Sequence, residues 1–171
     1  MDNMRPMPPA ERAKKRLTAF KDLRQSIDYK TERLAMMEEK LGSISSPQIS
    51  DMPKAPSHGG NDRMIDAIAR KIDLEQEIQQ DIAKERAEYE AIQLIASVME
   101  KPDERTVIQL RYLDGAKWDE ISEVLFSRRD DFDMKSDNYL RQTDRIHGTA
   151  LLSFAAAEDE IGARGKSSKC H

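Results

Sequence analysis

The chain has 171 residues, of which 38% are hydrophobic and 35% charged, and its net charge is −4. This composition excludes binding to nucleic acid through bulk positive charge, so any DNA contact needs a local basic surface. Cys170 is the single cysteine, which excludes an internal disulfide, and no apolar stretch is long enough for a membrane span or a signal peptide. We therefore expect a cytoplasmic protein with no membrane partner.

The first forty residues predict a disordered start followed by a long helix. Residues 1–10 hold three prolines and are predicted to be disordered. Over residues 11–41, apolar side chains recur at alternating steps of three and four, broken by Lys30 at one inward position, which is a heptad-like pattern. Gly42 is expected to end this helix. Residues 42–63 are rich in Ser, Pro and Gly and predict a loop.

A second long helix is predicted over residues 63–100. Asn61 or Asp62 would cap its start, and Pro102 would end it. Both long helices carry an apolar stripe that must be covered. The simplest arrangement is an antiparallel, coiled-coil-like hairpin over residues 11–100, and a second subunit could close it further to give a homodimer.

Residues 103–126 predict two short amphipathic helices separated by the turn Leu113–Gly115, the scaffold of a helix-turn-helix. Residues 127–135 predict a charged loop. A third helix is expected over residues 136–157, capped by Ser136 or Asp137. Its expected buried face comprises Leu140, Ile146, Ala150, Leu151 and Phe154.

The predicted fold is thus all-α, with a long N-terminal hairpin followed by a three-helix module over residues 103–157. Residues 158–171 are polar and are predicted to form a flexible tail. Trp118 and Tyr112 are interpreted as core residues, because Trp118 repeats at helical spacing with other apolar side chains.

The third helix offers a polar row that suits DNA. Arg, Asn and Gln are the side chains that pair bidentately with base edges in the major groove. The candidate DNA-binding residues are Lys135, Asn138, Arg141, Gln142, Arg145 and His147. Candidate phosphate contacts are Arg128, Arg129 and Lys117. The competing interpretation is an ordinary solvated helix face.

Charge distribution favours DNA binding less clearly. Residues 103–157 contain eight Lys/Arg and eleven Asp/Glu, a net of −3, whereas release of counterions by basic residues is a major source of DNA affinity. The N-terminal helix supplies a second candidate basic surface, with a solvated face as the alternative. That surface would comprise Arg12, Lys14, Lys15, Arg16, Lys21 and Arg24.

Catalytic and metal chemistry find no pattern in the sequence. The three histidines are far apart and there is one cysteine, so no zinc-ligand spacing occurs. No Gly-rich phosphate loop or nucleophile motif is present. We therefore expect no enzyme activity, no catalytic residue, no metal site and no cofactor.

The module resembles a known family. Residues 104–115 followed by residues 118–125 resemble the first two helices of sigma factor region four, and residues 145–154 resemble the end of its recognition helix. Together with Tyr29-Lys30 and the Ser-Asp-Met-Pro-Lys sequence of residues 50–54, the order of segments over residues 15–155 resembles phage transcriptional regulators of the RinA/ArpU type.

The resemblance implies a non-catalytic regulator of phage or prophage late genes in the cytoplasm of a bacterial host. Its partner would be double-stranded DNA, with the third helix in the major groove and Arg141, Gln142 and Arg145 toward bases or phosphates. The long hairpin would dimerise or contact host RNA polymerase. The sequence departs from compact sigma-like modules at residues 127–135, where three aspartates would repel phosphates.

Two alternatives remain open. The first is a phage DNA-packaging component resembling a small terminase subunit, which also joins a helix-turn-helix to helical oligomerisation segments. The second is a coiled-coil adaptor that no longer binds DNA, which the acidic balance of the module would suit.

Overall fold

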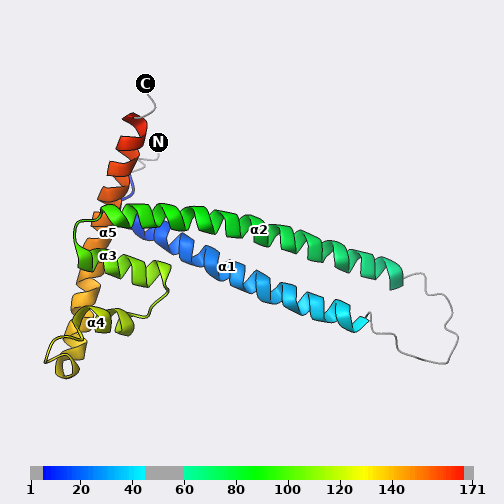
Figure 1. Cartoon of the computed structure of the whole chain (residues 1–171), viewed down its shortest axis with the longest axis horizontal. Helices are drawn as coiled ribbons and strands as arrows, with labels where there is room; N and C mark the ends of the chain where they lie inside the picture. The colour runs from blue at the N-terminus through cyan, green and yellow to red at the C-terminus, as the bar shows by residue number, and fades with distance from the viewer. Residues whose placement is uncertain (1–5, 45–59, 168–171) are drawn as a thin grey trace, which may run out of the picture. The chain divides into compact units, whose positions relative to one another are not determined.

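A computed structural model describes residues 6–44 and 60–167 of the chain, and these residues contain helices and no strand (Figure 1). The predicted all-α class is confirmed. The elements in chain order are α1 (Pro9–Ile44), α2 (Gly60–Val98), α3 (Pro102–Ile108), the π-helical turn η1 (Gln109–Leu113), α4 (Trp118–Phe126), the 3-10 turn η2 (Asp133–Lys135) and α5 (Ser136–Ser167).

Helix α1 is longer at both ends than the sequence predicts. It begins at Pro9, inside the segment predicted to be disordered, because proline is well tolerated in the first turn of a helix. It also continues through Gly42 to Ile44, so the prediction that Gly42 ends it is wrong. The remaining parts of the predicted N-terminal and loop segments, residues 1–5 and 45–59, lie outside the described residues.

The ends of α2 also differ from the prediction. The helix begins at Gly60, so Asn61 and Asp62 lie within it and are not its cap. It stops at Val98, before Pro102, which instead opens α3. A proline at this position loses no helical hydrogen bond, since the first N–H groups of a helix have no partner within it.

Helix α5 starts at Ser136 as predicted but runs to Ser167, ten residues beyond the predicted end. The prediction of a flexible tail is therefore wrong for residues 158–167, and residues 168–171 lie outside the described part of the chain. The extension carries an ion pair between Arg164 and Glu160, one helical turn apart. Such pairs stabilise exposed helix surfaces modestly.

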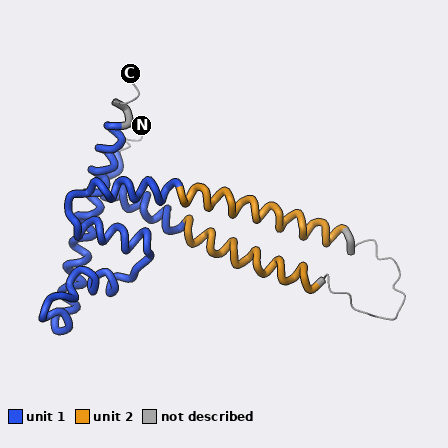
Figure 2. Tube along the Cα trace, viewed as in Figure 1, with its two compact units in different colours: residues 1–22, 87–171 blue, residues 23–86 orange. Residues whose placement is uncertain are grey.

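The chain divides into two compact units, residues 1–22 with 87–171 (unit 1) and residues 23–86 (unit 2), coloured in Figure 2. The start of α1 and the end of α2 therefore pack with the C-terminal helices, and the division does not fall at residues 100–103, where the sequence suggested it. The cause is one shared core. It comprises Ala13, Leu17, Phe20, Ile92, Ile95, Ala96, Met99, Ile108, Tyr112, Leu113, Ala150, Leu151, Phe154, Ala155 and Ala157.

Ion pairs join α1 to α5 within unit 1. Arg12 lies 2.8 Å from Asp159, and Arg16 pairs with both Glu88 on α2 and Glu158 on α5. Helices α3 and α4 both pack along α5 (Figure 1). The candidate basic surface on α1 is thus partly neutralised by acidic partners.

In unit 2, α1 and α2 run in opposite directions, since the partners of successive α1 residues fall at decreasing numbers on α2. The pairs are Arg24 with Glu85, Lys30 with Asp81, and Glu38 with Lys71. Lys30, which breaks the apolar pattern, lies 2.7 Å from Asp81 and 3.3 Å from Glu77. Its inward position therefore has an acidic partner on the opposite helix.

Candidate nucleic-acid interface

The first half of α5 is fixed by a buried face of mixed chemistry. Tyr139, Thr143, His147 and Ala150 follow one another at helical spacing and are all buried. The predicted face was partly wrong, because Leu140 and Ile146 are only half-buried while polar residues take the inner positions. These polar groups have partners: the Thr143 hydroxyl, for example, donates to the Tyr139 carbonyl at 3.0 Å.

His147 is not a DNA-facing residue, which corrects the sequence prediction. It is 9% exposed, and its Nε2 lies 2.9 Å from the hydroxyl of Tyr112 on η1. Trp118 on α4 meets its ring edge-on, with centroids 4.9 Å apart. Burial lowers the pKa of His147 and raises that of Tyr112. His147 therefore ties α5 to η1 and α4 as a neutral ring.

The turn between α4 and α5 is built around Tyr139. Its ring lies 4.9 Å from Phe126 and 5.7 Å from Phe132, centroid to centroid. Its hydroxyl donates to Asp131 at 2.6 Å, and Lys135 lies 2.8 Å from the other oxygen of the same carboxylate. The hydrogen bonds from Lys135 and Tyr139 lower the pKa of Asp131. The loop predicted over residues 127–135 is thus anchored by its own side chains.

Sequence reasoning missed this aromatic anchor. The available signal was three aromatic residues within fourteen positions of a chain that is only 5% aromatic. Clusters of this kind bury large areas and favour offset ring contacts. A turn that carries its own small core has a reason to keep one conformation.

Opposite the buried face, α5 presents a polar row. Asn138, Arg141 and Arg145 are exposed, and Gln142 is half-buried at the edge of the row. Their spacing of three and four places the exposed residues on one side of the helix. Lys135 is also exposed but is engaged by Asp131. Of the six predicted contacts, His147 is therefore the one that points into the core.

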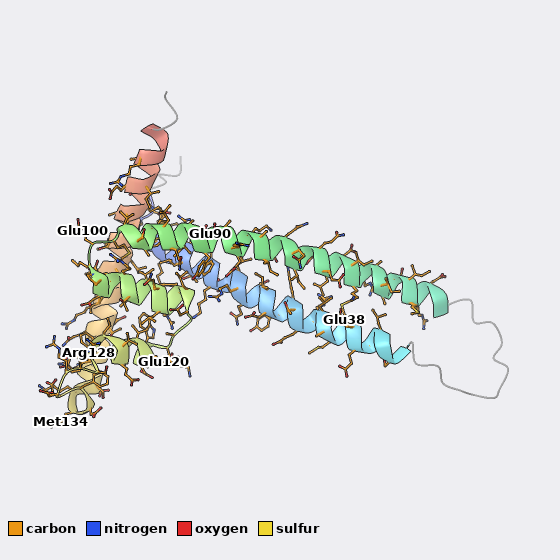
Figure 3. All side chains as sticks on the ribbon, in the orientation of Figure 1. Glu38, Glu90, Glu100, Glu120, Arg128 and Met134 are labelled. Carbon is orange, nitrogen blue, oxygen red and sulfur yellow. The ribbon has the colours of Figure 1, made fainter. Side chains whose placement is uncertain are left out.

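The three candidate phosphate contacts lie on two segments. Arg128 and Arg129 are exposed on the turn after α4, where Figure 3 labels Arg128. Lys117 is exposed at the start of α4, and its backbone N–H donates to the carboxylate of Glu120 at 2.7 Å. Residues 127–145 hold five basic and five acidic side chains, so this surface is neutral overall.

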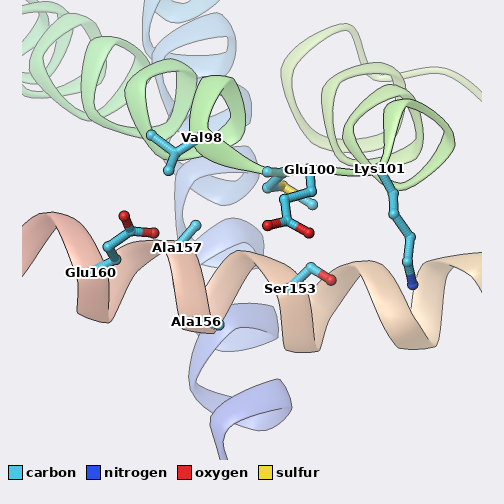
Figure 4. Close-up of a pocket in the computed structure, with 8 residues that line it drawn as sticks. Val98, Glu100, Lys101, Ser153, Ala156, Ala157 and Glu160 are labelled. Atoms are coloured by element: carbon cyan, nitrogen blue, oxygen red, sulfur yellow. The ribbon is translucent and has the colours of Figure 1, made fainter.

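Cavities in unit 1 are small and open. One of about 220 Å³ lies between the α2–α3 connection and α5, where Glu100, Ser153 and Glu160 line it beside small alanines (Figure 4). Another, of about 300 Å³, lies between α4 and α5. Pockets that enclose small ligands are usually at least this large and more apolar. Over residues 6–44 and 60–167, no group of three or more His, Cys, Asp or Glu is placed to hold a metal ion.

Helices of the described segments are all too short in apolar sequence to cross a bilayer. The arrangement of unit 1 therefore offers a solvent-facing polar row on a fixed helix, and this row is the candidate interface. Comparison of the chain with protein-family models, with curated proteins and with solved structures found no match.

Proposed function

We propose that this protein is a non-catalytic transcriptional regulator that binds double-stranded DNA through α5. One observation carries the proposal: Asn138, Arg141 and Arg145 form an exposed row on a helix whose opposite face is buried. These side chains can recognise base edges, and a helix of this kind fits the major groove. In the proposal α3, α4 and α5 act as a helix-turn-helix, with α5 as the recognition helix.

The anchoring of α5 supports this role. A reading helix has to hold its side chains in register with the bases, and the inner face of α5 is held by Tyr139, Thr143 and His147 through hydrogen bonds and ring contacts. Arg128 and Arg129 on the adjoining turn are exposed cations suited to phosphates. The neutral balance of the surface predicts modest affinity that depends on a few direct contacts.

The resemblance to sigma factor region four and to RinA/ArpU-type regulators extends the proposal to phage or prophage genes. In this proposal, unit 2 acts as a helical hairpin that either pairs with a second copy or contacts host RNA polymerase. The antiparallel ion pairs of unit 2, such as Lys30 with Asp81, are consistent with a stable two-helix element.

A binding experiment on the full chain tests the proposal. Preferred duplexes are first selected from a random-sequence library, and affinity for them is measured by fluorescence anisotropy at several salt concentrations. Arg141→Ala/Arg145→Ala is expected to weaken binding at least tenfold, since one good base contact contributes about 1–3 kcal/mol. The matched control Arg63→Ala/Arg70→Ala removes the same charge from exposed positions of α2.

The control variant should bind as the parent protein does. Equal losses in both double variants would mean that only bulk charge matters, and would refute the assignment of α5. Absence of salt-dependent binding to any selected duplex would refute DNA binding altogether.

A further inference from the structure

We propose that Met134 contacts the methyl group of a thymine in bound DNA and makes the protein selective for that base. The inference rests on the proposed function. Met134 is 89% exposed, more than any other large hydrophobic side chain among the described residues. Single exposed apolar residues are common on protein surfaces, so exposure alone decides little. The position of Met134 relative to the polar row is what carries the argument.

Met134 opens the same row that Asn138, Arg141 and Arg145 continue. It lies in η2, which leads directly into α5, as Figure 3 shows by its label. The intervals along the row are four, three and four residues, the spacing of neighbours on one helix face. All four side chains are exposed, whereas Tyr139, one residue out of phase, is buried. A surface that covers the row therefore also covers Met134.

The backbone around Met134 is held in place before any ligand binds. Tyr139 packs on Phe126 and Phe132, which flank the turn on both sides. The Tyr139 hydroxyl also donates to Asp131, three residues before Met134. A side chain presented from an ordered backbone costs less conformational entropy on binding than one from a mobile loop. The turn thus offers an apolar thioether at a defined place.

Thymine is the base that an apolar side chain can recognise in the major groove. Its C5 methyl group is the one apolar feature among the groove edges of the four bases, while the other edges present hydrogen-bond donors and acceptors. The thioether of methionine is flexible and adapts its shape to such a group. Asn138 and Arg141 would meet polar base edges, and Met134 would supply the complementary apolar contact.

Replacement of thymine by deoxyuridine isolates this contact, because it removes the methyl group and nothing else. Each thymine of a selected duplex is replaced in turn, and the dissociation constant of the full chain is measured. At one position the loss is expected to be about fourfold, the effect of one buried methyl-sized group. Met134→Ala is expected to bind the thymine and deoxyuridine duplexes equally. Met36→Ala, which changes a methionine that is 60% exposed on α1, is the matched control and should keep the fourfold difference.

The outcomes separate the two proposals. If Arg141→Ala/Arg145→Ala weakens binding but Met134→Ala keeps the same thymine preference at every position, the inference about Met134 is overturned and the proposed function stands. If no thymine is preferred over deoxyuridine in the parent protein, the inference is overturned as well. If the full chain binds no duplex, both are overturned.

Discussion

Leu17→Ala should destabilise the region around Trp118, although the two residues are about a hundred positions apart in sequence. Leu17 is fully buried in the core that α1 shares with α2, α3 and α5. Truncation of such a leucine costs about 2–5 kcal/mol, because it removes apolar contacts and leaves a cavity. With a middle value of about 3 kcal/mol, the Tm should fall by roughly 12 °C for a unit of this size.

The assay uses the single tryptophan, which lies in unit 1 at the start of α4. Urea unfolding is followed by Trp118 fluorescence, so that the probe reports on the proposed reading region and not on the site of the substitution. Leu152→Ala is the matched control, because Leu152 is 52% exposed on α5 and its truncation should change stability by about 0.5 kcal/mol or less.

A Trp118 transition unchanged by Leu17→Ala would refute this reasoning. It would mean that residues 103–157 fold independently, as the sequence suggests, and that the start of α1 only rests against them. The shared core predicts the opposite: one cooperative transition for unit 1, in which the first helix stabilises a surface to which it contributes no side chain.

Three further predictions concern other sites. Burial lowers the pKa of His147, so the unfolded chain takes up a proton first and stability should fall as the pH drops below the ordinary value of about 6.5; His147→Phe should flatten this loss between pH 7 and 5 in urea midpoints, and identical slopes would contradict it. Lys30→Glu should speed hydrogen exchange in unit 2 by placing a carboxylate beside Asp81, and the added Asp81→Lys exchange of charges should reverse the effect; no recovery would argue against the pair. Gly115 has a φ of +74°, so Gly115→Ala should cost about 1 kcal/mol in thermal unfolding, and an unchanged Tm would contradict this.

The helical class and several helix starts could be predicted because their signals are local. The turn before Trp118 contains Gly115, whose positive φ few other residues adopt, and α4 follows it directly. Helix α5 begins at Ser136, as expected from its polar start and apolar repeat. Helix ends were harder, since Gly42 can be carried inside a helix at a cost of only about 1 kcal/mol.

The candidate site shows the same division between local and distant information. The exposed positions of Asn138, Arg141 and Arg145 follow from helical spacing, which the sequence contains. The inward position of His147 does not, because its partner Tyr112 is 35 residues away and meets it only after α3 and α5 pack. The shared core of α1 and α5 is equally distant in sequence, which is why the two compact units could not be predicted.

The π-helical turn at Gln109–Leu113 makes this region sensitive to the number of residues as well as to their identity. Its widened ring is closed by a hydrogen bond from the Asp114 N–H to the Gln109 carbonyl at 3.0 Å. Deletion of one residue here would restore regular α-helical winding and rotate everything beyond it by about 100°. Tyr112 would then turn away from His147, so related chains should tolerate substitutions at Gln109 far more readily than a one-residue deletion.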